Sequence, residues 1–180
     1  LRYPWLVLKY LVRGGGCDFI FIPEFRHKDV PLGRFLSWIS GKPLIFNPLV
    51  SREETKVEDW ERIAPYSPSA CYNHFIDKIS FLLPDLLLCD TFEHRRYYVE
   101  RFGIPEAKTR VVRLGYDDQI FYPRPSSPNR SFRVLFYGSY IPLHGIRHII
   151  EAARILEAHH DISFRLIGNG QTRGEAERFA

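Results

Sequence analysis

The sequence predicts an α/β fold with parallel sheets. Apolar runs of strand length alternate with helix-length segments from residue 18 to residue 114, and a proline-rich stretch separates them from a further strand–helix–strand pattern. Strands that alternate with helices across short connections are typical of parallel sheets covered by helices. The chain has 180 residues, of which 45% are hydrophobic and 15% aromatic, so it can form a core and is not expected to be disordered.

Residues 1–123 are expected to form a Rossmann-like domain that is incomplete at its start. Its predicted strands span 18–22, 44–46, 85–89 and 110–114, and its predicted helices span 4–13, 31–40, 69–83 and 92–102. Asp29 is expected to cap the second helix with its side chain, because Asp is favoured at helix N-termini. The third helix is expected to bury an apolar face of residues at helical spacing. These residues are Cys71, Phe75, Ile79 and Leu82.

A second domain is predicted over residues 132–180, after a linker at 124–131 that is rich in Pro and Ser. It would contain a strand over 134–137, a helix up to about residue 159 and a strand over 163–167. Gly138 follows the first strand, and Gly145 opens the helix. The turn between them is a candidate ligand site, since helix N–H groups and the positive end of the helix dipole point there.

Charge and cysteine content give weaker indications. A net charge of +4 and a pI near 9.0 would suit an anionic substrate, nucleic acid or a membrane surface and selects none of them, and an ordinary protein surface explains them most simply. We expect no nucleic-acid partner. Cys17, Cys71 and Cys89 form no CxxC pair and no metal-ligand spacing, so we expect a reduced, cytoplasmic setting and no metal site. The sequence has no apolar run long enough to span a membrane.

Two groups of motifs together point to a known family. The first group, in the second domain, is Gly138, Ser139, His144, Gly145 and Glu151-Ala152-Ala153. The second, in the first domain, is Asp90-Thr91, Gly115-Tyr116-Asp117 and Phe121-Tyr122-Pro123. In order and spacing they resemble the retaining glycosyltransferases of family 4. The resemblance implies the GT-B fold, with a Rossmann-like acceptor domain and the beginning of a Rossmann-like nucleotide-sugar domain.

The resemblance also implies an activity and its residues. A sugar would move from a nucleotide-diphosphate donor to an acceptor hydroxyl with retention, without a metal or another cofactor. The implied donor-binding residues are Gly138, Ser139, His144, Gly145, Gly168 and Gly170. His27 is the implied catalytic residue, and Arg26, Asp90 and Thr91 are the implied acceptor-binding residues. The family usually has Arg at the position of Ser139 and Lys at that of His144, so diphosphate binding is expected to be weaker here.

Some features of the family fall outside these 180 residues. Its second-domain Glu-x7-Glu motif would lie beyond Ala180, and its first-domain glycine loop would precede Leu1. We therefore interpret the chain as a fragment that is inactive by itself. A lipid-linked acceptor at the inner face of the membrane is a further hypothesis, with membrane contact through Arg95, Arg96, Tyr97 and Tyr98.

Several alternatives stay open. A non-catalytic GT-B-like binding module would explain why Ser139 and His144 replace cations. A nicotinamide-dependent oxidoreductase would rest on a glycine pattern ending at Gly174, which fits the dinucleotide fingerprint imperfectly. Among single residues, His27 could be an exposed loop histidine, and Asp90 or Thr91 could be a helix N-cap.

Overall fold

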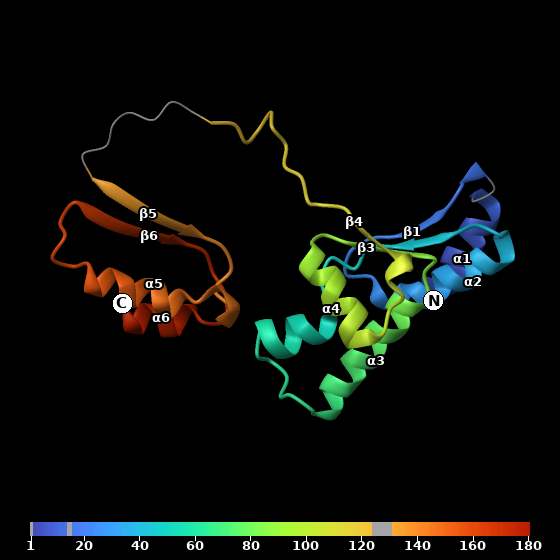
Figure 1. The fold of residues 1–180 in the computed structure, drawn as a ribbon, viewed down its shortest axis with the longest axis horizontal. Helices are drawn as coiled ribbons and strands as arrows, with labels where there is room; N and C mark the ends of the chain where they lie inside the picture. Colours follow the sequence, from blue (N-terminus) through green and yellow to red (C-terminus); the bar gives the residue numbers. More distant parts are fainter. Residues whose placement is uncertain (1, 14–15, 124–130) are drawn as a thin grey trace. The chain divides into compact units, whose positions relative to one another are not determined.

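The computed structural model describes residues 2–13, 16–123 and 131–180, which form two compact units (Figure 1). The first unit comprises Leu1–Thr55 and Ala64–Gly115, and the second comprises Lys56–Ile63 and Tyr116–Ala180. Of the predicted linker at 124–131, all but Ser131 lies outside the described residues. Each unit contains a parallel sheet, as the sequence predicted.

The sheet of the first unit has four parallel strands in the order β1-β2-β3-β4. The strands are β1 (Ile20–Ile22), β2 (Leu44–Phe46), β3 (Leu86–Cys89) and β4 (Thr109–Val111). Because all four run the same way, the loops that follow them gather at one edge of the sheet, the carboxyl edge. The fourth strand is shorter than predicted, since its pairing with β3 ends where Cys89 lies opposite Val111.

Helix α1 precedes the first strand, and the other helices lie between or after strands (Figure 1). They are α1 (Arg2–Arg13), α2 (Val30–Ser40), α3 (Pro68–Leu82) and α4 (Phe92–Phe102), with short helical turns η2 (His27–Asp29), η3 (Glu54–Asp59) and η4 (Glu106–Lys108). Ser67 and Thr91 begin α3 and α4 by accepting backbone N–H bonds with their hydroxyl oxygens. Gly41 and Gly103 end α2 and α4 in the left-handed conformation that glycine adopts without strain.

Asp29 precedes α2 but does not cap it with its side chain. Its carboxylate instead accepts a hydrogen bond from the Tyr3 hydroxyl at 3.0 Å and pairs with Arg2 at 2.5 Å. The predicted side-chain cap is therefore wrong, because α1 places a cation and a hydroxyl where they compete for the same oxygens.

The prediction of which face of α3 is buried is also wrong in part. Cys71 is exposed, and Phe75 is 60% exposed. The buried positions of this helix include Asn73, Asp77 and Ser80. The core beside them is aromatic and aliphatic, so α3 presents polar groups to the inside of the unit. That core consists of Val30, Leu44, Phe46, Phe81, Leu87, Cys89, Tyr98, Phe102 and Ile104.

The second unit has two parallel strands, β5 (Phe132–Tyr137) and β6 (Ile162–Ile167), paired from Phe132 opposite Ile162 to Tyr137 opposite Ile167. A short turn η5 (Pro142–His144) leads into α5 (Ile146–Ile155), and α6 (Arg173–Phe179) follows β6. Both helices lie against one face of the strands (Figure 1). Their small core is Tyr140, Ile146, Ile150 and Ala176, with Phe136 and Leu166 packed against it.

Candidate functional site

The loops that follow β1 and β2 meet at the carboxyl edge of the first unit. The Asn47 backbone N–H donates to the Ile22 carbonyl at 3.0 Å, and its side-chain amide donates to Glu24 at 2.7 Å. Each loop also holds a bulky residue in the left-handed region, Phe25 at φ 61° and Leu49 at φ 66°. Non-glycine residues adopt this conformation at a cost that is often found at functional sites.

His27, the sequence-predicted catalytic residue, is buried in η2 with only 2% of its surface exposed. Its ring packs on Phe46 and Phe81, and Nε2 lies 3.1 Å from the Val50 carbonyl oxygen. Because a carbonyl only accepts, this contact requires the hydrogen on Nε2. The alternative expectation, an exposed loop histidine, is wrong. Direct contact of this buried ring with a substrate stays a prediction.

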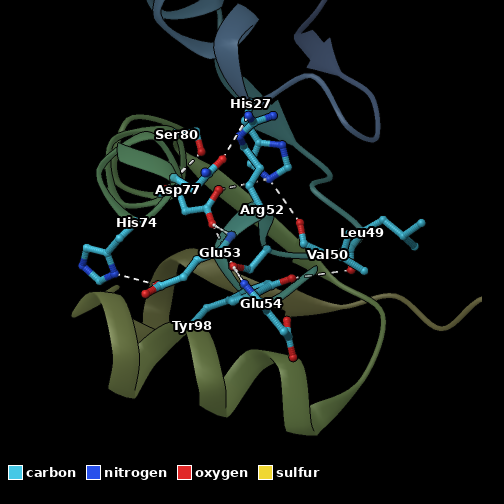
Figure 2. Close-up of polar contacts among 12 residues, drawn as sticks. His27, Leu49, Val50, Arg52, Glu53, Glu54, His74, Asp77, Ser80 and Tyr98 are labelled. Carbon is cyan, nitrogen blue, oxygen red and sulfur yellow. Dashed lines mark hydrogen bonds and ion pairs between the residues drawn. The ribbon is translucent and has the colours of Figure 1, made fainter. Parts of the chain in front are cut away.

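Asp77 of α3 is a buried carboxylate that the sequence did not single out. Its Oδ2 accepts the Ser51 hydroxyl at 2.7 Å and the Glu53 backbone N–H at 2.8 Å, and its Oδ1 lies 3.7 Å from His27 Nε2 (Figure 2). Burial raises its pKa to about 6, although the two hydrogen bonds and the charge of Arg52 favour the ionised form. This carboxylate can therefore change its protonation state near neutral pH.

Glu53, two residues after Ser51, has a pKa shifted in the opposite direction to that of Asp77. The Glu53 carboxylate accepts from Arg101 at 2.6 Å. It also lies 2.7 Å from His74 Nδ1 (Figure 2). Burial alone would raise the pKa of Glu53, but the hydrogen bonds from Arg101 and His74 outweigh it and lower that pKa. The loop after β2 is thus fixed by α3 through Asp77 and His74, and by α4 through Arg101.

Asp90 and Thr91, predicted to bind the acceptor, lie between β3 and α4. The Thr91 hydroxyl oxygen accepts the His94 N–H at 3.0 Å, so the helix-cap alternative for this residue is confirmed. Asp90 lies 2.5 Å from His94 Nδ1, and His94 Nε2 lies 3.9 Å from Glu54. Both predicted residues also line a cavity of about 420 Å³. Its other lining residues are Phe92, Glu93, Arg113 and Leu114.

The other residues predicted to have a function in the first unit differ in their exposure and contacts. Arg26 is exposed at the start of η2. Tyr98, one of the residues expected at a membrane, is fully buried, so that part of the membrane hypothesis is wrong. Arg95 pairs with Glu106 at 2.5 Å, whereas Arg96 is exposed. In the described parts of the chain, no helix combines the length and the apolar character needed to cross a bilayer.

In the second unit, the predicted donor-binding residues lie together around the turn after β5. Gly145 adopts φ 57° and precedes α5, and His144 and Ser139 are exposed. His144 Nδ1 lies 2.5 Å from the Ser139 carbonyl oxygen, which requires the hydrogen on Nδ1. A neutral ring then presents only a lone pair at Nε2, whereas an imidazolium presents a second N–H donor and a charge.

Gly168 and Gly170 follow β6 and lie against the same turn. A Cβ on Gly168 would lie 1.9 Å from the Gly138 carbonyl oxygen, and one on Gly170 would lie 2.4 Å from the Tyr140 carbonyl oxygen. The two backbones approach so closely that no side chain fits between them. The two glycines therefore have a packing reason to be present, which removes the main support for the nicotinamide alternative.

The structure also brings in polar residues that the sequence analysis missed. These are Asp77, Glu53, His74, His94 and Arg101. For Asp77 the sequence signal was the helical spacing of Asn73, Asp77 and Ser80, which an apolar-periodicity argument interprets as a solvent face. In the part of the chain that the structure describes, no three His, Cys, Asp or Glu side chains form a cluster that could hold a metal ion.

This fold is found in solved GT-B glycosyltransferases. HepE of Anabaena with UDP and glucose matches with a TM-score of 0.64 at 16% identity, over 97% of this chain and 46% of that chain. HepE with UDP-glucose matches with a TM-score of 0.59 at 16% identity, over 91% of this chain and 43% of that chain. A TarM mutant of S. aureus in complex with fondaparinux, alpha-GlcNAc-glycerol and UDP matches with a TM-score of 0.61 at 10% identity. The match covers 94% of this chain and 32% of that chain.

The sequence itself matches no described protein family and no curated protein. At the identities above, the structural likeness shows the fold alone. The predicted GT-B-like α/β fold is thereby confirmed. The chain spans less than half the length of the solved structures that it matches.

Proposed function

We propose that this chain is part of a retaining glycosyltransferase of family 4, with a nucleotide-diphosphate sugar as donor and a hydroxyl as acceptor. The turn after β5 carries the proposal. There Gly138 and Gly145 lead the backbone into the start of α5 with positive φ angles, and the exposed His144 adds an imidazole beside them. A leaving diphosphate needs this kind of charge stabilisation, which a helix N-terminus and a cation supply without a metal.

The donor class is proposed as a uridine diphosphate sugar. HepE, which shares this fold, was crystallised with UDP and with UDP-glucose. The second unit would hold the donor, and the first unit would hold the acceptor through Arg26, Asp90 and Thr91. Residues 132–180 carry no Glu-x7-Glu motif, so we expect these 180 residues alone to bind the donor weakly and not to transfer the sugar.

Calorimetric titration with UDP-glucose, UDP and NADH tests the donor site. UDP should bind saturably to the wild type. His144→Ala should weaken this binding several-fold, and His144→Arg, which places a permanent charge and further N–H donors next to the diphosphate, should tighten it. Saturable binding of NADH without binding of UDP would contradict the proposal and favour an oxidoreductase.

A non-catalytic binding module is the second candidate, because Ser139 and His144 stand where family 4 usually has Arg and Lys. It is distinguished by the same titration. A module without a donor site would bind neither UDP nor UDP-glucose, and His144→Arg would not create binding. A lipid-linked acceptor stays a hypothesis, for which charge reversal of the exposed Arg96 should weaken pelleting with anionic vesicles.

A further inference from the structure

A single carboxylate organises the turn formed by Val50–Glu54. Asp77 Oδ2 accepts both the Ser51 hydroxyl and the Glu53 N–H, and the Ser51 oxygen in turn accepts the Glu54 N–H at 3.1 Å (Figure 2). The Ser51 carbonyl also accepts the Thr55 N–H at 3.1 Å. Three successive backbone N–H groups are therefore held by Asp77 and Ser51 together. This turn has no regular sheet partner that could fix it instead.

Fold stability alone does not explain a carboxylate at the position of Asp77. Its surface is fully buried, and Phe46 and Phe81 pack on the neighbouring His27 ring. A buried carboxylate loses its hydration, and apolar residues of similar volume often replace buried charges without loss of stability. The geometry of its contacts therefore explains this carboxylate better than fold stability does.

The same carboxylate faces the catalytic candidate. Asp77 Oδ1 and the Val50 carbonyl lie 3.7 Å and 3.1 Å from His27 Nε2. Both are negative or partly negative oxygens, so both favour the tautomer with hydrogen on Nε2. A substitution of Asp77 would thus remove one of the two oxygens that face His27 Nε2. It would also move the Val50 carbonyl, the other oxygen, by releasing the turn.

The turn also connects to the proposed acceptor residues. Glu54, whose N–H bonds to Ser51, lies 3.9 Å from His94 Nε2 through its carboxylate. His94 Nδ1 in turn lies 2.5 Å from Asp90. Polar contacts therefore run from Asp77 to Asp90, all within the first unit.

We propose that Asp77 is a positioning residue, whose carboxylate fixes the Val50–Glu54 turn and the tautomer of His27 at the carboxyl edge of the first unit. The proposal deepens the glycosyltransferase assignment and rests on it, since His27 and Asp90 matter for transfer only if that assignment holds. Asp77 itself need not touch a substrate.

Charged and titratable groups face Asp77 from each element packed around it. They are His27 of η2, Arg52 and Glu53 of the loop after β2, and Tyr98 of α4. Burial raises the pKa of Tyr98 far above its ordinary value, so this phenol stays neutral. His27 is the group whose ring lies nearest to Asp77 Oδ1, at 3.7 Å, so the test follows its ring nitrogens as well as the turn.

The test is NMR on the whole chain without nucleotide. In the wild type, the Glu53 and Glu54 amide signals should move as the pH passes through about 6. Asp77→Asn should remove this titration, shift the His27 ring nitrogens and speed Glu53 amide exchange roughly tenfold or more, since a charge-assisted hydrogen bond is lost. Its thermal midpoint at about pH 7.5 should be equal or higher, because a buried charge is removed.

Asp85→Asn is the matched control. Asp85 also accepts a backbone N–H, from Leu44 at 2.8 Å, and pairs with Arg34 at 2.9 Å. This variant should lower the thermal midpoint without moving the turn or His27 signals. If Asp77→Asn leaves those signals in place, or if Asp85→Asn moves them equally, the positioning role is overturned.

A second variant keeps the test decisive should Asp77→Asn fail to fold. Ser51→Ala should speed exchange of the Glu54 amide and leave the Glu53 amide, which Asp77 holds directly, nearly unchanged. Equal acceleration of both amides would contradict the proposal. These signals need no nucleotide, so failure of UDP binding would remove the transferase assignment and leave the positioning result intact.

Discussion

The two units fix their candidate site loops by opposite means. In the first unit, buried side chains hold the loop after β2, with Asp77 and Glu53 as the acceptors. In the second unit, the absence of side chains at Gly168 and Gly170 lets two loops touch backbone to backbone. The difference indicates that the first loop responds to protonation, whereas the second responds mainly to steric change.

The largest expected effect is steric. Gly168→Ala would place a Cβ 1.9 Å from the Gly138 carbonyl oxygen, against backbone that cannot rotate away. We expect a loss of roughly 3 kcal/mol or more in the stability of the second unit. Amide exchange in β5 and β6 measures it. Gly174→Ala is the control, because a Cβ there meets nothing within 4 Å, and a comparable loss in this variant would contradict the explanation.

The next effect is electrostatic and belongs to the first unit. The pKa of Asp77 rises from 3.8 to about 6 on folding, so the native state binds this proton more tightly than the unfolded chain. Its contribution of roughly 3 kcal/mol is present below about pH 4 and is lost as the pH rises through about 6. Denaturant unfolding from pH 4 to 8 should show this fall in the wild type and a flatter profile in Asp77→Asn. Identical profiles would contradict it.

Glu53 should show the opposite sign. Its pKa is lowered, so its contribution is present above its ordinary pKa and is lost on acidification. Arg101→Ala leaves the carboxylate with His74 alone and should cost about 1–2 kcal/mol at neutral pH. The loss should shrink as the pH falls. A loss that is independent of pH would indicate that Arg101 acts through packing instead.

The smallest effect concerns His144, which is exposed and hydrogen-bonded to its own loop. His144→Ala should change the stability of the second unit by less than about 0.5 kcal/mol, as for other surface substitutions. UDP affinity should nevertheless fall several-fold in calorimetry, because the ring is proposed to lie at the donor site. A large loss of stability would show that the ring holds the turn together.

The sequence was sufficient for the elements and for the fold. β2 and α4 have the predicted bounds, because turn and cap residues such as Gly41, Thr91 and Gly103 act locally. The predicted donor-binding residues also cluster, since strand-end turns in a parallel pair share one edge.

The buried polar groups could not be predicted in the same way. Asp77 meets Ser51 from 26 residues away, and Arg101 meets Glu53 from 48 residues away. Contacts between residues so far apart in the sequence produce no local pattern from which they could be predicted. The polar residues of α3 also have the spacing that is expected of a solvent-exposed helix face. The apolar periodicity therefore placed Cys71 and Phe75 inside, where the structure has Asn73 and Asp77.

The most direct test of the proposed donor site is a titration of the ¹⁵N-labelled chain with UDP, followed by NMR. We predict that the amide signals of Gly138, Ser139 and Gly145 move first and saturably. The turn at Val50–Glu54 should be unaffected by pure donor binding. Unchanged signals at millimolar UDP, or shifts confined to other residues, would contradict the donor site and with it the proposed transferase.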